Sequence, residues 1–297
     1  MAIGIDPTVD YAFKLMLGSP LHPAITLHFL NAILSPEIQI TEVEILNPIL
    51  GKEDEIDKLS ILDVAARDST GRLFDIEMQT SLPAGLSQRL AYYTASLYVG
   101  QISQGDDYTV LRPAIGICVL DAILFRHSPQ IHNDFRLRSR QGGFDLTNGL
   151  QIHLLELPKY KLPSDNRIIT DPVEAWLYLF RRGSEMTTQD IKRRFSSPAF
   201  AEVAEILEMI QRTPDQRSQY ELRLKAQRDD RARLQQARAE GEELGRAEGK
   251  AEGKLIGRIE TLNGLLGMQL CPLDGLSVDE LLSIADDLQR QLRERGV

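Results

Sequence analysis

Cysteine, tryptophan and long apolar runs are scarce in this sequence. Among 297 residues there are 2 cysteines and 1 tryptophan. Cys118 lies in an apolar run and Cys271 lies far beyond it, so the chain has neither a C-x-x-C ligand pair nor a disulfide framework. No apolar stretch approaches the ~18 residues of a membrane-spanning helix, and no charged leader precedes an apolar core at the N-terminus. We therefore expect a soluble, cytoplasmic protein.

Positive charge is also in short supply. The chain carries 34 Lys and Arg against 43 Asp and Glu, which gives a net charge of -9. Residues 1–180 hold 14 basic against 22 acidic side chains (net -8), and residues 181–297 hold 20 against 21 (net -1). The total does not indicate a basic surface for nucleic acid. It does not forbid a DNA substrate either, because a bound metal ion would offset the carboxylates of its own site.

The most informative stretch runs from Leu59 to Thr80. Two apolar runs are separated by the polar segment Arg67–Arg72, whose single glycine suits a hairpin connection. Alternation in the second run predicts an apolar strand face (Phe74, Ile76, Met78) and an opposite face (Leu73, Asp75, Glu77, Gln79). Asp63 interrupts the first run, where a buried carboxylate is costly without a cation or a hydrogen-bond partner. Two paired strands that each offer a carboxylate indicate a cation site.

The residue types in this stretch favour a hard divalent cation. Asp63 and Glu77 offer oxygen ligands, and no histidine or cysteine stands in the motif, so magnesium or manganese suits it better than a softer metal. Mg²⁺ keeps several waters and takes one or two protein carboxylates, so a sparse ligand set suffices. Gln79 could orient a water or a phosphate oxygen, but it cannot supply the charge of a lysine. Phosphodiester hydrolysis is the chemistry that this set suits.

Helical and strand patterns on both sides of the hairpin predict a mixed α/β domain over residues 1–165. We expect helices at 8–18, 25–34 and 85–104, and strands at 38–50, 59–66, 73–79, 113–120, 135–140 and 150–157. A helical extension is expected over residues 166–213. A long charged helix over 214–260 and a short helical segment over 261–297 follow it.

The long segment contains a four-residue repeat with one glycine in each unit (Gly241, Gly245, Gly249, Gly253, Gly257). Each interior glycine costs a helix ~1 kcal/mol relative to alanine, and like charges four residues apart repel. Close approach of a second helix, from this chain or another copy, would offset that cost. A solvated helix or partly disordered spacer is the alternative, and the sequence leaves both open.

The spacing of Asp63, Glu77 and Gln79 resembles the PD-(D/E)XK nuclease core, in its variant with Gln in place of the terminal Lys. Several blocks over residues 8–160 are similar to the Rpn-type recombination-promoting nuclease/putative transposase family: D-Y-A-F-K-L-M-L-G, F-L-N-A-I-L, V-E-I-L-N-P, D-K-L-S-I-L-D-V, F-D-I-E-M-Q, R-L-A-Y-Y-T-A-S-L-Y and H-L-L-E-L-P-K-Y. The resemblance implies a restriction-endonuclease-like mixed sheet flanked by helices. It also implies a magnesium-dependent DNA endonuclease linked to recombination or mobile elements.

Carried over to this sequence, the resemblance makes Asp63 and Glu77 metal ligands and catalytic residues, with Gln79 in the lysine position. Asp10 is the best-placed acid on the first helix, and Lys58 is a further candidate. We expect Asp75 to be solvated or peripheral. Three alternatives remain open: Asp63 could pair with Arg67 or Arg89 within the core, Lys14 and Arg89 could stabilise the fold or contact phosphates, and the chain could be a non-catalytic DNA-binding or oligomerising protein that keeps the fold.

Overall fold

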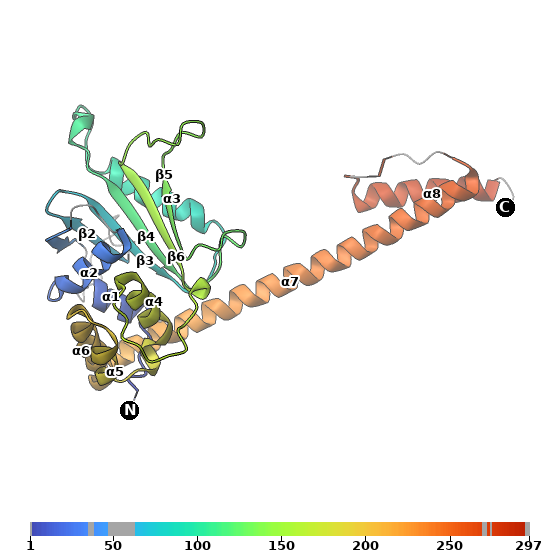
Figure 1. The fold of residues 1–297 in the computed structure, drawn as a ribbon. Helices are drawn as coiled ribbons and strands as arrows, with labels where there is room; N and C mark the ends of the chain where they lie inside the picture. Colours follow the sequence, from blue (N-terminus) through green and yellow to red (C-terminus); the bar gives the residue numbers. More distant parts are fainter. Residues whose placement is uncertain (1, 35–38, 47–62, 269–271, 274, 295–297) are drawn as a thin grey trace. The chain divides into compact units, whose positions relative to one another are not determined.

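Six strands form one mixed sheet in the order β1-β2-β3-β4-β6-β5 (Figure 1). The computed structural model describes residues 2–34, 39–46, 63–268, 272–273 and 275–294. The strands are β1 (Val43–Ile45), β2 (Val64–Asp68), β3 (Leu73–Gln79), β4 (Ala114–Leu120), β5 (His132–Arg136) and β6 (Leu150–Glu156). Strands β3, β4 and β6 run parallel to one another, and the other neighbours pair antiparallel. The sheet confirms the predicted fold class.

Strands β2 and β3 form the expected hairpin. Ala65 pairs with Asp75 and Val64 pairs with Ile76. Gly71 has φ of +90°, a left-handed conformation that glycine adopts without steric cost. The carboxylate of Asp68 closes the turn, because it accepts hydrogen bonds from the backbone N–H groups of Thr70 and Arg72. The turn therefore fixes the register that brings the acidic residues of the two strands together.

Helices cover both faces of the sheet. The apolar β3 face packs into the main core with α1 (Asp10–Leu17), α2 (Pro23–Leu34), α4 (Pro172–Arg182), α5 (Thr188–Arg194) and α6 (Ala199–Arg212). The predicted apolar face is confirmed, because Phe74, Ile76 and Met78 all lie in this core. Helix α3 (Leu86–Val99) covers the other face, where Leu90 packs against Cys118 of β4. Short 3-10 turns are at Tyr108–Val110, Leu157–Lys159 and Gly183–Glu185.

Three predicted elements have different bounds in the structure. The helix expected over 85–104 ends at Val99, and Gly100 is its C-cap. The strand expected over 135–140 is β5, which lies at the sheet edge and whose mixed polar sequence gives no clear alternation. Of the strand expected over 38–50, the described residues form only Val43–Ile45, and residues 47–50 lie outside the described part.

The chain divides into two compact units, residues 1–231 and 232–297. Helix α7 (Pro214–Leu266) begins in the first unit, where Tyr220 is buried in the main core and its hydroxyl accepts the N–H of Asp6 at 2.9 Å. In the second unit, the end of α7 packs against α8 (Val278–Glu294) through a small apolar cluster that includes Ile259, Leu262, Leu281 and Leu288. None of the helices in the described part of the chain combines the length and the apolar character that a membrane span requires.

Candidate active site

Asp63 lies immediately before β2, and the continued hairpin register places it opposite Glu77 of β3. Asp63 Oδ2 accepts the backbone N–H of Met78 at 3.1 Å, so this carboxylate is tied to β3 between Glu77 and Gln79. Glu77 is almost completely buried. The structure therefore brings together the three residues that the sequence singles out.

The Glu77 carboxylate has two weak donors. The Gln79 side-chain amide and the Arg89 guanidinium each lie 3.4 Å from Glu77 Oε2. Arg89 comes from α3, on the face of the sheet that carries Glu77. Both distances are at the long end for hydrogen bonds, so Glu77 retains free acceptor capacity.

Helix α1 supplies a cation between two carboxylates. Lys14 Nζ lies 3.1 Å from Asp63 Oδ1 and 2.9 Å from Asp10 Oδ1. The partner of Asp63 is therefore Lys14, whereas Arg67 pairs with Glu44 on β1. Asp10 and Lys14 are four residues apart and share one helix face. Asp10 thus lies beside the site, as the resemblance implies for a first-helix acid, and Lys58 lies outside the described residues.

Asp75 corrects one expectation. It was expected to be solvated or peripheral, but only 2% of it is exposed. Its neighbours across the sheet are Ala65 and Gly116, and α3 covers that face, which excludes water. Its Oδ1 atom is buried and has no hydrogen-bond partner among the described residues. Asp75 is therefore a buried carboxyl group next to Glu77 and belongs to the site.

The carboxyl groups of this cluster are short of compensating charge. Burial, and then the charges of Glu77 and Asp63, raise the pKa of Asp75 well above its ordinary value. Burial and the charge of Asp63 raise the pKa of Glu77. Burial also raises the pKa of Asp63, although Lys14 opposes the shift. For Lys14, burial works against the charged form, but Asp63 and Asp10 outweigh it and raise the pKa. The Lys14 ammonium therefore stays charged, but its single positive charge does not balance the carboxyl groups of Asp63, Asp75 and Glu77.

These residues fit a divalent cation. Asp63 and Glu77 present hard oxygen donors, and the buried Oδ1 atom of Asp75 lacks a partner. The mutual repulsion of the three carboxyl groups would fall if a cation bound among them. Within the described part of the chain, no group of three or more His, Cys, Asp or Glu side chains is arranged to hold a metal ion. Asp63 and Glu77 are the two carboxylates that would hold such a cation.

The first part of α7 borders the same end of the sheet. Arg231 donates to the carbonyl of Thr80 at 2.8 Å and to the carboxylate of Asp121 at 3.0 Å. Thr80 directly follows Gln79, and Asp121 directly follows β4. Arg223 lies 4.0 Å from Asp10. The helix thus contacts the site on the α1 side and on the β3 side.

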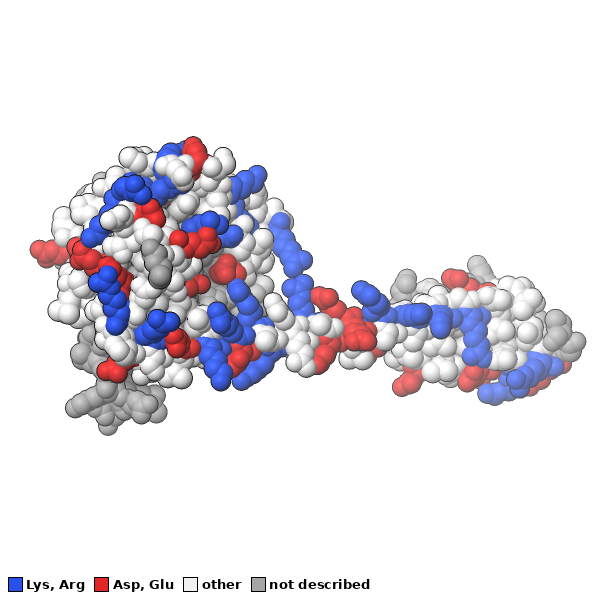
Figure 2. Space-filling model, turned by 90° about the horizontal axis from the view of Figure 1, so that it is seen from below, with Lys and Arg blue, Asp and Glu red and all other residues white. Residues whose placement is uncertain are grey.

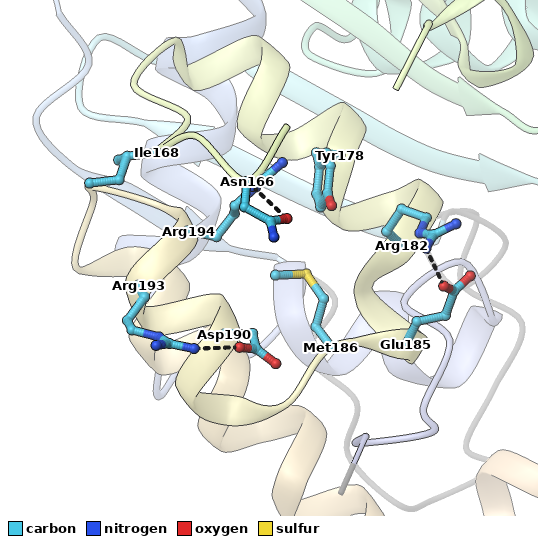
Figure 3. A pocket seen from close by; sticks show the side chains of 9 residues that line it. All are labelled: Asn166, Ile168, Tyr178, Arg182, Glu185, Met186, Asp190, Arg193 and Arg194. Atoms are coloured by element: carbon cyan, nitrogen blue, oxygen red, sulfur yellow. Dashed lines mark hydrogen bonds and ion pairs between the residues drawn. The ribbon is translucent and has the colours of Figure 1, made fainter. Parts of the chain in front are cut away.

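A separate cavity of about 720 Å³ involves α4, α5 and the segment before α4 (Figure 3). Two of its arginines are neutralised, Arg182 by Glu185 at 2.6 Å and Arg193 by Asp190 at 2.8 Å. The lining does not include Asp63, Asp75 or Glu77. The full lining is Asn166, Ile168, Tyr178, Arg182, Glu185, Met186, Asp190, Arg193 and Arg194. The candidate active site is therefore the acidic end of the β2–β3 hairpin.

Two features of the site could have been found by sequence reasoning. Alternation already placed Asp75 on the face of Glu77 and Gln79, so its membership of the site was within reach of the sequence, and the spacing of Asp10 and Lys14 pairs them on one helix face. The contacts of Arg89 and Arg231 could not have been found, because they depend on how α3 and α7 pack against the sheet.

A mixed sheet with helices on both faces, whose central hairpin carries Asp63 and a Glu-x-Gln strand, agrees with the PD-(D/E)XK fold. The chain belongs to the PD-(D/E)XK nuclease family transposases, whose family model matches residues 7–237. No curated protein and no solved structure gives a significant match to the chain.

Proposed function

We propose that the protein is a magnesium-dependent DNA endonuclease that acts in recombination or on mobile elements. The observation that carries the proposal is the joining of Asp63 to β3 beside Glu77, in a cluster of acids with unbalanced charge. Family membership supports the reaction class, since a nuclease hydrolyses phosphodiester bonds.

Each residue has a separate task in this reaction. Asp63 and Glu77 would hold Mg²⁺ or Mn²⁺, which supplies a nucleophilic water and neutralises charge on the phosphate. Gln79 orients the attacking water or a phosphate oxygen through its amide, which points toward Glu77. The Met78 N–H holds Asp63 in place, so that its second oxygen faces Lys14 and the site.

The second candidate is a DNA-binding or oligomerising protein that keeps the fold without cleaving. The replacement of the family lysine by Gln79 favours it, because a neutral amide is a weaker electrostatic catalyst. The distribution of charge on the surface gives less support to a DNA-binding role. On the face in Figure 2, basic and acidic side chains are intermixed, and Arg136 and Arg138 are paired with Asp134 and Asp145.

A plasmid assay separates the two candidates. Supercoiled DNA is incubated with Mg²⁺ or Mn²⁺ and with wild type, Asp63→Asn, Glu77→Gln or a control, Glu205→Gln. Glu205 forms a surface ion pair with Lys192 at 2.9 Å, so the control removes a carboxylate outside the site. We expect nicking by wild type and the control, and a loss of ~10²-fold or more in the two site variants. Equal nicking by all four proteins, or none by any in either metal, would overturn the endonuclease proposal.

We also propose that the protein self-associates through the glycine row of α7. An added Cβ at Gly241, Gly245, Gly249, Gly253 or Gly257 would meet no described atom within 4 Å. Packing among the described residues of one chain therefore does not require these glycines. A partner helix that approaches closely would explain why a helix retains them at ~1 kcal/mol each.

A further inference from the structure

The proposed reaction needs a cation that the motif itself does not supply. Negative charge builds on the phosphate oxygens in the transition state, and a fixed positive group beside them lowers the barrier. Gln79 stands where the family pattern has lysine, and its amide is neutral. Among the described residues, Lys14 and Arg89 are the cations that contact the motif carboxylates.

Lys14 is the better placed of the two. Its ammonium lies 3.1 Å from Asp63 and 2.9 Å from Asp10, whereas Arg89 has a single contact of 3.4 Å with Glu77. Helix α1 is anchored by four buried side chains, Ala12, Phe13, Met16 and Leu17. The position of the lysine is therefore set by the core.

Asp10 keeps Lys14 in place independently of Asp63. The two residues are neighbours on one helix face, so Lys14 retains a partner when Asp63 binds another cation. A lysine ammonium has three donors. Two point at Asp10 and Asp63, and the third is available for an oxygen of a bound molecule. The side chain is 28% exposed, which leaves it accessible from solvent.

We propose that Lys14 takes the part of the missing motif lysine and contacts a non-bridging oxygen of the scissile phosphate. This inference rests on the proposed function. Asp10 is then a positioning residue, because it acts through Lys14 without contacting the DNA itself. The first helix, and not β3, supplies the catalytic charge.

The first test is cleavage by Lys14→Gln, Lys14→Arg and the double variant Lys14→Gln/Gln79→Lys. We expect kcat of Lys14→Gln to fall by ~10²–10³-fold, with a smaller change in KM. Lys14→Arg keeps the charge and should be intermediate. The double variant restores a cation to the site and should recover about tenfold or more. Lys192→Gln is the matched control, because Lys192 forms a surface ion pair with Glu205 and should cleave as wild type does.

The second test is DNA binding without divalent metal, which does not depend on cleavage. One lost phosphate contact should reduce the slope of log K against log salt by about 0.9 in duplex DNA. Circular dichroism and thermal melting of Lys14→Gln and Lys14→Arg check that both variants are folded.

The two tests give separable outcomes. Wild-type rates and an unchanged salt slope in Lys14→Gln would overturn the inference. Lost cleavage with an unchanged slope and no recovery in the double variant would overturn it too, since that result indicates a structural role. If no protein cleaves but Lys14→Gln still lowers the slope, the endonuclease proposal fails and the Lys14 phosphate contact stands.

Discussion

Asp63 Oδ2 accepts the backbone N–H of Met78 at 3.1 Å, which ties the residue before β2 to the strand that carries Glu77. Asp63→Ala removes the acceptor and leaves the Met78 N–H unpaired near the core. We expect the free energy of unfolding to fall by ~1–3 kcal/mol. Asp63→Asn keeps an oxygen in the same place and should lose less. Urea unfolding of both variants in EDTA measures the difference, and equal losses would show that the hydrogen bond does not contribute.

The buried charge of Asp75 predicts how stability depends on pH. The folded pKa of Asp75 lies well above its ordinary value of 3.8, so the folded state holds the proton more tightly than the unfolded chain. Stability is therefore lost as pH rises from 3.8 through the raised folded pKa, and the loss is complete above it.

Asp75→Asn removes that loss. In metal-free buffer, we expect the variant to unfold at higher urea than wild type at pH 7.5, with a smaller difference at pH 4.5. Glu205→Gln is the control, because its carboxylate is on the surface. A variant that is less stable than wild type by the same amount at both pH values would contradict this account.

The buried His153 predicts the opposite dependence of stability on pH. It is buried, and its Nδ1 lies 2.9 Å from His132 Nε2. Burial lowers the pKa of His153 from 6.5 to about 4. The unfolded chain takes up a proton first as pH falls below 6.5, so stability is lost between 6.5 and 4. At pH 5 the loss is roughly 2 kcal/mol.

His153→Gln tests this pH dependence. The variant should show a smaller fall in unfolding free energy between pH 7 and pH 5 than wild type. The exposed His127, changed to Gln, should behave as wild type. Asp75 and Glu77 also contribute to the pH dependence, because their raised pKa values stabilise the folded state in acid. This contribution is common to wild type and His153→Gln, so the difference between the two proteins reports the histidine. An identical fall in wild type and His153→Gln would exclude His153 as the source.

Sequence reasoning reached the central hairpin because its signals are local. Alternation fixes which face Phe74 and Glu77 occupy, and a polar segment with one glycine marks the turn. Burial depends on tertiary packing, so local sequence signals do not show it. The same alternation places Asp75 beside Glu77, but only the packing of α3 shows that water is excluded there. The contact of Arg231 with Thr80 spans 151 positions and depends on where α7 packs against the sheet. No periodicity in the sequence indicates that position.

The glycine row of α7 gives the last prediction. Wild type should sediment as an oligomer, and Gly245→Leu/Gly249→Leu should lower its mass because the leucines block close approach of a second helix. The control, Glu248→Leu/Glu252→Leu, places the same side chains on another row and should leave the mass unchanged. Helicity distinguishes self-association from the alternative, a solvated helix without a partner. In an isolated helix, replacing glycine removes a cost of ~1 kcal/mol per site, so circular dichroism should rise without a change in mass. A mass and helicity both equal to wild type would contradict association through this row.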